Sequence, residues 1–148
     1  MSAIMPTYGR LPVSFASGDG AYLFDQKGLR YIDALSGIAV TNIGHSHPNV
    51  TRAVQEQAET LIHTSNLYGI PQQERLAVEL TQLTGMENVF FCNSGAEANE
   101  TAIKVARRHG RKKGIETPHI IVLEGAFHGR TMGALSATGN TTIQESFK

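Results

Sequence analysis

The sequence NVFFCNSGAE, residues 88–97, joins an apolar segment to the start of a helix. Its first five residues are mostly β-branched or aromatic, which favours a buried strand. A helical pattern runs from Ser94 to His109, where Gly110 is predicted to end the helix. A second apolar run, HIIVL at residues 119–123, predicts another buried strand. A strand, a helix and a strand within about 35 residues form a βαβ unit with parallel strands and a right-handed crossover. The sequence therefore predicts an α/β fold.

Two further helices are predicted upstream of this unit. Apolar residues recur every three or four positions between residues 50 and 62, with Pro48 in the first turn and Ser46 or His47 as the cap. A second helix is predicted from near Pro71 to Leu83, before the natural stop at Gly85.

The N-terminal region is predicted to contain a β-hairpin. Residues 21–25 and 29–33 are apolar-rich and flank a short turn with Gly28. Residues 36–40, SGIAV, are predicted to be a loop, and residues 1–12 an irregular arm. We therefore expect a small N-terminal lobe ahead of the βαβ unit.

The composition excludes several classes of function. Of the 148 residues, 41% are hydrophobic and 18% charged, and the formal net charge is zero. A neutral chain has no overall attraction for nucleic acid or for an anionic membrane. No apolar run approaches the roughly 20 residues of a membrane span, and the N-terminus lacks the pattern of a signal peptide. The single cysteine, Cys92, excludes an internal disulfide, and we expect a cytoplasmic protein.

The turn at residues 93–97 has the features of a phosphate cup. Ser94 and Glu97 form a capping box, in which the glutamate is expected to reach back to the N–H of Ser94. Gly95 and Ala96 have almost no side chain, so an anion has room beside the free N–H groups of the first helical turn. A capping box alone is more often an ordinary helix start, and both interpretations stay open at this point.

The segment EGAFHGRT, residues 124–131, leaves the second predicted strand. In a parallel sheet it emerges at the same edge as the phosphate cup. Phe127 is suited to stacking on a flat heterocycle, although a lone phenylalanine is more often a core residue. Arg130 is suited to binding a carboxylate through two hydrogen bonds. His128 is either a proton carrier or, more commonly for a loop histidine, a structural hydrogen-bonding residue.

Two smaller patterns have structural explanations. Glu100 and Lys104 have the (i, i+4) spacing of a helix-surface ion pair. His45 and His47 suggest a metal site, but no third ligand accompanies them, so we predict no metal and a role at the helix start.

Four ordered motifs together resemble the class III pyridoxal-phosphate aminotransferases, and within them the acetylornithine type. They are FCNSGAEANETAIK at residues 91–104, AFHGRT at 126–131, SGIAV with GHSHP at 36–40 and 44–48, and SNLY at 65–68. The resemblance implies a partial aspartate-aminotransferase-like fold. Residues 1–48 would be the arm and hairpin of the small domain, and residues 49–148 the first, truncated part of the large cofactor-binding domain with its parallel-rich sheet.

The resemblance also assigns roles to single residues. Ser94, Gly95 and Ala96 would bind the phosphate of pyridoxal 5'-phosphate, Phe127 would stack on its pyridine ring, and Arg130 would bind a substrate carboxylate. The implied reaction transfers the δ-amino group of N-acetylornithine to 2-oxoglutarate in arginine biosynthesis, catalysed by a homodimer. The roles of His45, His47, Asn66, Tyr68 and His128 stay open.

The lysine that binds the cofactor in this family has no counterpart here. The chain has Lys27, Lys104, Lys112, Lys113 and Lys148, and none matches the family's position. We therefore expect an N-terminal piece of an aminotransferase that is inactive alone. Two alternatives are another class III enzyme (an ornithine, succinylornithine or 4-aminobutyrate aminotransferase, or an aminomutase) and a non-catalytic α/β assembly module.

Overall fold

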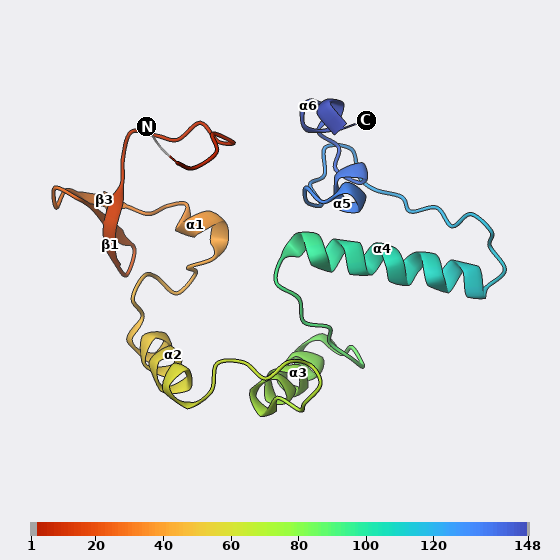
Figure 1. Cartoon of the computed structure of the whole chain (residues 1–148), viewed down its shortest axis with the longest axis horizontal. Helices are drawn as coiled ribbons and strands as arrows, with labels where there is room; N and C mark the ends of the chain where they lie inside the picture. The colour runs from red at the N-terminus through yellow and green to blue at the C-terminus, as the bar shows by residue number, and fades with distance from the viewer. Residues whose placement is uncertain (1–2, 148) are drawn as a thin grey trace. The chain divides into compact units, whose positions relative to one another are not determined.

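The computed structural model describes residues 3–147, which divide into two compact units. The first unit ends at Tyr68 and the second begins at Gly69 (Figure 1). The predicted boundary between residues 48 and 49 concerns the domains of a longer protein, and it stays a prediction.

The first unit contains a three-stranded antiparallel sheet. Strand β1 spans Phe15–Asp19, β2 spans Tyr22–Asp25 and β3 spans Arg30–Ile32, in the order β1-β2-β3. The predicted hairpin corresponds to β2 and β3, which pair from Tyr22 opposite Ile32, and is confirmed. Sequence patterning missed β1 because its sequence, FASGD, contains only one large apolar residue.

Residues 36–40 are not the simple loop that was predicted. Helix α1, Ser36–Ala39, is a single turn in which all four residues have positive φ, including 61° at Ile38. Left-handed backbone costs an L-residue roughly 1–2 kcal/mol, so this turn needs support from outside it. Asp33 provides it, because its Oδ1 accepts hydrogen bonds from the N–H groups of Leu35 (3.1 Å) and Ser36 (2.8 Å).

The second carboxylate oxygen of Asp33 binds His45. The distance from His45 Nε2 to Asp33 Oδ2 is 2.7 Å. This hydrogen bond is the main cause that holds the pKa of Asp33 below its usual value; partial burial acts in the opposite direction. His45 is thus a structural partner of Asp33. His47 occupies the cap position of the following helix, but its side chain makes no capping hydrogen bond.

Replacing Asp33 with asparagine is expected to destabilise the chain in a pH-dependent way. A lowered folded-state pKa means that ionised Asp33 stabilises the fold above the unfolded value of about 3.9, and that this contribution is lost as the pH falls through the folded-state pKa. The variant should therefore be less stable than the parent at pH 7, and the difference should shrink below about pH 4.

Urea unfolding followed by tyrosine fluorescence at pH 7 and pH 3 measures both differences. Asp19→Asn is the control, because the described structure shows no side-chain partner for Asp19. A difference between parent and Asp33→Asn that is the same at both pH values would contradict the assignment.

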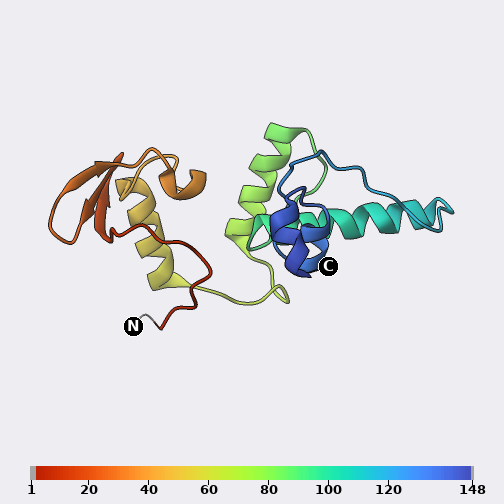
Figure 2. The same cartoon turned by 90° about the horizontal axis from the view of Figure 1, so that it is seen from above.

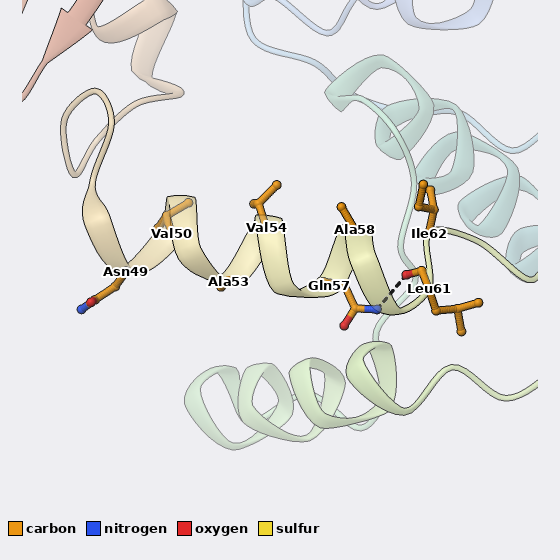
Figure 3. A pocket seen from close by; sticks show the side chains of 8 residues that line it. All are labelled: Asn49, Val50, Ala53, Val54, Gln57, Ala58, Leu61 and Ile62. Atoms are coloured by element: carbon orange, nitrogen blue, oxygen red, sulfur yellow. Dashed lines mark hydrogen bonds between the residues drawn. The ribbon is translucent and has the colours of Figure 1, made fainter.

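Two predicted helices are confirmed. Helix α2 spans Pro48–Thr60 with its proline in the first turn, and α3 spans Pro71–Thr84 and ends at Gly85 in the left-handed conformation, with φ 69°. Figure 3 shows the residues of α2 and of the segment directly after it that line an open pocket: Asn49, Val50, Ala53, Val54, Gln57, Ala58, Leu61 and Ile62. No helix between residues 3 and 147 is long and apolar enough to cross a membrane.

Helix α4 is longer than predicted. It spans Gly95–Lys112, so Gly110 lies inside the helix and does not end it. Gly110 is buried, and a Cβ atom there would lie 2.9 Å from the ring of Pro118. This glycine is required for the close approach of the following segment. After the C-cap residue Lys113, Gly114 has a φ of 79° and terminates the helix in a Schellman motif, with the hydrogen bond from Ile115 N to Gly110 O at 3.0 Å.

The two predicted parallel strands are not formed as strands. Residues 88–92 and 119–123 belong to no helix or strand in the described chain, and Ile121 and Leu123 are 96% and 80% exposed. The prediction of a paired βαβ unit was wrong for these residues. Apolar patterning encodes a preference for burial, whereas a ladder also requires a neighbouring strand about 4.8 Å away, which the described residues do not supply.

Short helices follow in the second unit, and sequence patterning did not predict them. They are α5 (Met132–Ser136), α6 (Thr141–Gln144) and the 3-10 helix η1 (Glu145–Phe147). Ala134 and Leu135 of α5 and the nearby Thr138 are buried. Figures 1 and 2 both show α5 beside the first turns of α4, and contacts between the two helices agree with this.

Candidate functional site

The start of α4 has the geometry of a capped helix. Ser94 is the N-cap residue, and its Oγ accepts a hydrogen bond from Glu97 N at 3.2 Å. The carboxylate of Glu97 accepts from the N–H of Asn93 at 2.5 Å. The predicted capping box is confirmed, except that Glu97 reaches Asn93 and not the N–H of Ser94. The capping box therefore also holds Asn93, the residue directly before the N-cap.

Two N–H groups at this helix start remain available. Among the described residues, the amides of Gly95 and Ala96 have no hydrogen-bond acceptor. A Cβ atom built at Gly95 meets nothing within 4 Å, so the space beside it is open. Free donors at the positive end of an 18-residue helix, beside a residue without a side chain, favour the binding of an anion such as a phosphate.

The segment at residues 124–131 lies against this same end of α4. Asn99 Nδ2 donates to the backbone oxygen of His128 at 2.6 Å. Gly129 packs on Ala96 so closely that a Cβ atom at Gly129 would lie 2.8 Å from that of Ala96. The predicted proximity of the two segments is present, but its cause differs. A side face of α4 holds the loop, whereas the prediction relied on the edge of a parallel sheet.

Thr138 organises the interior of the loop. Its side chain is buried, and Oγ1 accepts from the N–H of His128 at 3.0 Å. The same hydroxyl lies 3.1 Å from the carbonyl oxygen of Gly129 and 3.0 Å from that of Ala134, and it donates to one of them at a time. One hydroxyl thus connects the middle of the loop to α5. The sequence contained no signal for this role, because an isolated threonine after a short helix is common.

Glu100 has partners other than the predicted one. Its Oε1 accepts from the hydroxyl of Thr131 at 2.5 Å and from the N–H of Ala134 at 3.1 Å. The described structure shows no ion pair within 4 Å between Glu100 and Lys104, so that prediction was wrong. The hydrogen bond from Thr131 is the main cause that lowers the pKa of Glu100, and Lys104 contributes least. A carboxylate with directed donors nearby turns toward them in preference to an exposed lysine.

The remaining predicted residues lie in the same loop. Phe127 is 65% exposed, and Arg130 is also exposed. His128 contributes its backbone to the loop, while its buried Nδ1 has no hydrogen-bond partner in the described structure. Nothing in the structure assigns a ligand to these three side chains, so their roles stay predictions.

The sequence patterns did not predict that Asn99 and Glu100 hold the loop. These two residues lie three and four residues after Ala96 and therefore share one face of the helix with it. The sequence signal for this contact was the presence of two polar side chains on the helix face that also carries Ala96. Within residues 3–147, no group of three or more His, Cys, Asp or Glu side chains is arranged to hold a metal ion.

Known proteins match this chain along nearly its whole length. The model of the family "Aminotransferase class-III" matches residues 4–148. The acetylornithine aminotransferase of Nitrosomonas europaea is 60% identical over the whole chain, which covers 38% of that protein. Acetylornithine aminotransferase 1 of Bordetella parapertussis is 51% identical, with 99% of this chain and 37% of that protein covered.

Solved structures agree with the sequence relatives. The ornithine aminotransferase from Toxoplasma gondii, whose structure reports partial occupancy of PLP at the active site, has a TM-score of 0.89 and 29% identity over 99% of this chain and 35% of that one. A PLP-bound amine transaminase from an uncultivated Pseudomonas species has a TM-score of 0.86 and 28% identity, with 99% and 36% covered.

The chain belongs to the class III aminotransferase family. Within that family it is similar to acetylornithine aminotransferases, and it spans a little over a third of their length. The α/β transaminase fold predicted from the four motifs is confirmed, as a partial fold.

Proposed function

We propose that the first turn of α4 binds the phosphate of pyridoxal 5'-phosphate. Ser94, Gly95 and Ala96 would hold it, through the two free N–H groups and the serine hydroxyl. The single observation that carries this is the open space at Gly95 beside amides that have no other acceptor. The residues fit a phosphate because no bulky side chain fills the space beside Gly95. The carboxylate of Glu97 lies at this helix start, but it belongs to the capping box and accepts from the N–H of Asn93.

The loop would supply the other contacts. Phe127 would stack on the pyridine ring, and Arg130 would bind a substrate carboxylate with its planar fork. When bound, the cofactor supplies a ring that stores the electron pair released from the substrate carbon. The docking of the loop on α4 at Asn99 and Gly129 supports a common site.

The activity of the longer protein would be transfer of an amino group from N-acetylornithine to 2-oxoglutarate. Identities of 47–60% to acetylornithine aminotransferases, against 28–30% to the ornithine, omega and amine transaminases of known structure, support the acetylated substrate. The 148 residues alone would be inactive, since no lysine among them matches the family's cofactor-binding position. A cytoplasmic homodimer is part of the same proposal.

A chimera tests this function. Residues 1–148 replace the matching part of the Nitrosomonas europaea enzyme, which is 60% identical there. We expect the chimera to develop a visible absorbance band with pyridoxal phosphate, to retain the cofactor covalently after borohydride, and to transaminate N-acetylornithine in preference to ornithine. The 148-residue chain should show no such band. A borohydride-fixed adduct on the chain alone, or a chimera that prefers ornithine, would contradict the corresponding part of the proposal.

A further inference from the structure

One face of α4 holds the start of α5. Thr131 is the N-cap residue of α5, yet its side chain makes no capping bond to that helix. Instead its hydroxyl and the N–H of Ala134 both donate to Oε1 of Glu100, and the N–H of Gly133 also interacts with this carboxylate. The N-terminus of α5 is therefore capped by a residue that lies 31–34 positions earlier in the chain.

A cap supplied by another helix also connects the two helices. An ordinary N-cap side chain satisfies the first N–H groups locally and leaves the helix free to move. Glu100 accepts from these donors while lying on α4, so separating α5 from α4 breaks the hydrogen bonds of the exposed Thr131 hydroxyl and of the partly buried Ala134 N–H together. Gly133 allows the contact, because a Cβ atom there would collide with the carboxylate oxygens of Glu100.

Two connections to α4 bracket the loop. Asn99 binds the backbone oxygen of His128, and Glu100 binds Thr131 and Ala134. Arg130 lies between these attachment points, and Phe127 immediately precedes the first. Asn99 and Glu100 lie one helical turn after Ala96, so the loop is held at a set distance from the amides of Gly95 and Ala96.

We propose that Glu100 is a positioning residue, whose carboxylate holds the loop that carries Phe127 and Arg130 beside the phosphate-binding turn. This inference rests on the proposed function for the role of that turn. In this role Glu100 acts through the first turn of α5, by its hydrogen bonds with Thr131 and Ala134. The charge matters because a carboxylate accepts several hydrogen bonds at once and interacts favourably with the positive end of a helix.

The first test measures the position of the loop in the 148-residue chain. Amide hydrogen exchange of residues 126–136 is compared in the parent, Glu100→Gln and Thr131→Val. The matched control is Glu79→Gln, which removes the charge of an exposed carboxylate on α3 that has no side-chain partner in the described structure. We expect exchange of the Gly133 and Ala134 amides to accelerate about tenfold in Glu100→Gln and Thr131→Val. The control, and Thr131→Ser, which keeps the hydroxyl, should match the parent.

The second test measures function in the chimera, at a temperature well below the melting point of each variant. We expect Glu100→Gln to raise both the dissociation constant for pyridoxal phosphate and the KM for 2-oxoglutarate about tenfold, with a smaller change in kcat. A residue that only supports the fold would lower the melting temperature and leave the dissociation constant and KM unchanged, and that result would overturn the proposal. So would unchanged amide exchange in both Glu100→Gln and Thr131→Val. If the parent chimera binds no cofactor, the proposed function fails, while the exchange measurement still decides whether Glu100 holds the loop.

Discussion

Replacing Gly95 with aspartate is expected to reduce the affinity of the chimera for pyridoxal phosphate at least about 100-fold, because a carboxylate placed against a phosphate costs several kcal/mol. The same change should leave the fold intact. Gly95 does not have a positive φ, and a Cβ atom there meets nothing within 4 Å. An acidic residue in the first turn of a helix stabilises it by about 0.3–1 kcal/mol. The variant thus separates binding from stability.

Gly95→Asn is the matched control, since asparagine has the size of aspartate without its charge. It should weaken cofactor binding less than Gly95→Asp, and the difference measures the electrostatic part of phosphate recognition. Binding is followed by titration of the cofactor absorbance, and stability by thermal unfolding. A Gly95→Asp chimera that binds the cofactor as tightly as the parent would show that the phosphate lies elsewhere.

Gly129→Ala is expected to lower the unfolding free energy of the second unit by roughly 2–6 kcal/mol. Two effects act together. The φ of Gly129 is 130°, a conformation that L-residues rarely adopt, and a Cβ atom would lie 2.8 Å from Cβ and 3.0 Å from Cα of Ala96. The neighbouring atoms belong to the first turn of α4 and cannot rotate away. The variant should therefore also displace the loop from the first turn of α4, where we propose that the phosphate binds.

Gly125→Ala separates the two effects. Gly125 has a φ of 71°, but a Cβ atom there meets nothing within 4 Å, so only the conformational cost of roughly 1–2 kcal/mol remains. Adding Ala96→Gly to Gly129→Ala should recover part of the lost stability, because it removes the nearest atom. Chemical denaturation measures all four proteins. Equal losses for Gly125→Ala and Gly129→Ala would mean that the loop does not pack on α4.

Much of the local structure was predictable from the sequence. The starts of α2 and α3 follow from a proline before an apolar period, and the end of α3 from Gly85. The β2–β3 hairpin and the cap of α4 also depend only on residues close together in the chain. Each of these features is stabilised by interactions across a few positions, so a short window of sequence contains the necessary information.

Other local patterns were misleading because a distant residue decides their role. Gly110 has the sequence appearance of a helix stop, yet it lies within α4 to admit Pro118. Glu100 has the spacing of an ion pair with Lys104, yet it binds Thr131 and Ala134. In both cases the competing partner lies outside the window in which periodicity and (i, i+4) rules apply.

The sequence by itself therefore determined the family, the starts of the helices between residues 48 and 112, the β2–β3 hairpin and the capping box in the turn before α4, because motifs and caps are local. The tertiary structure alone decided how the loop of Phe127 and Arg130 reaches that turn. The loop is held there by Asn99 and Glu100 on one face of α4 and by the packing of its own Gly129 on Ala96. The paired parallel strands that the apolar runs predict are not involved. Hydrogen bonds and close packing between segments about 30 residues apart depend on where the chain folds back, and no short stretch of sequence specifies that.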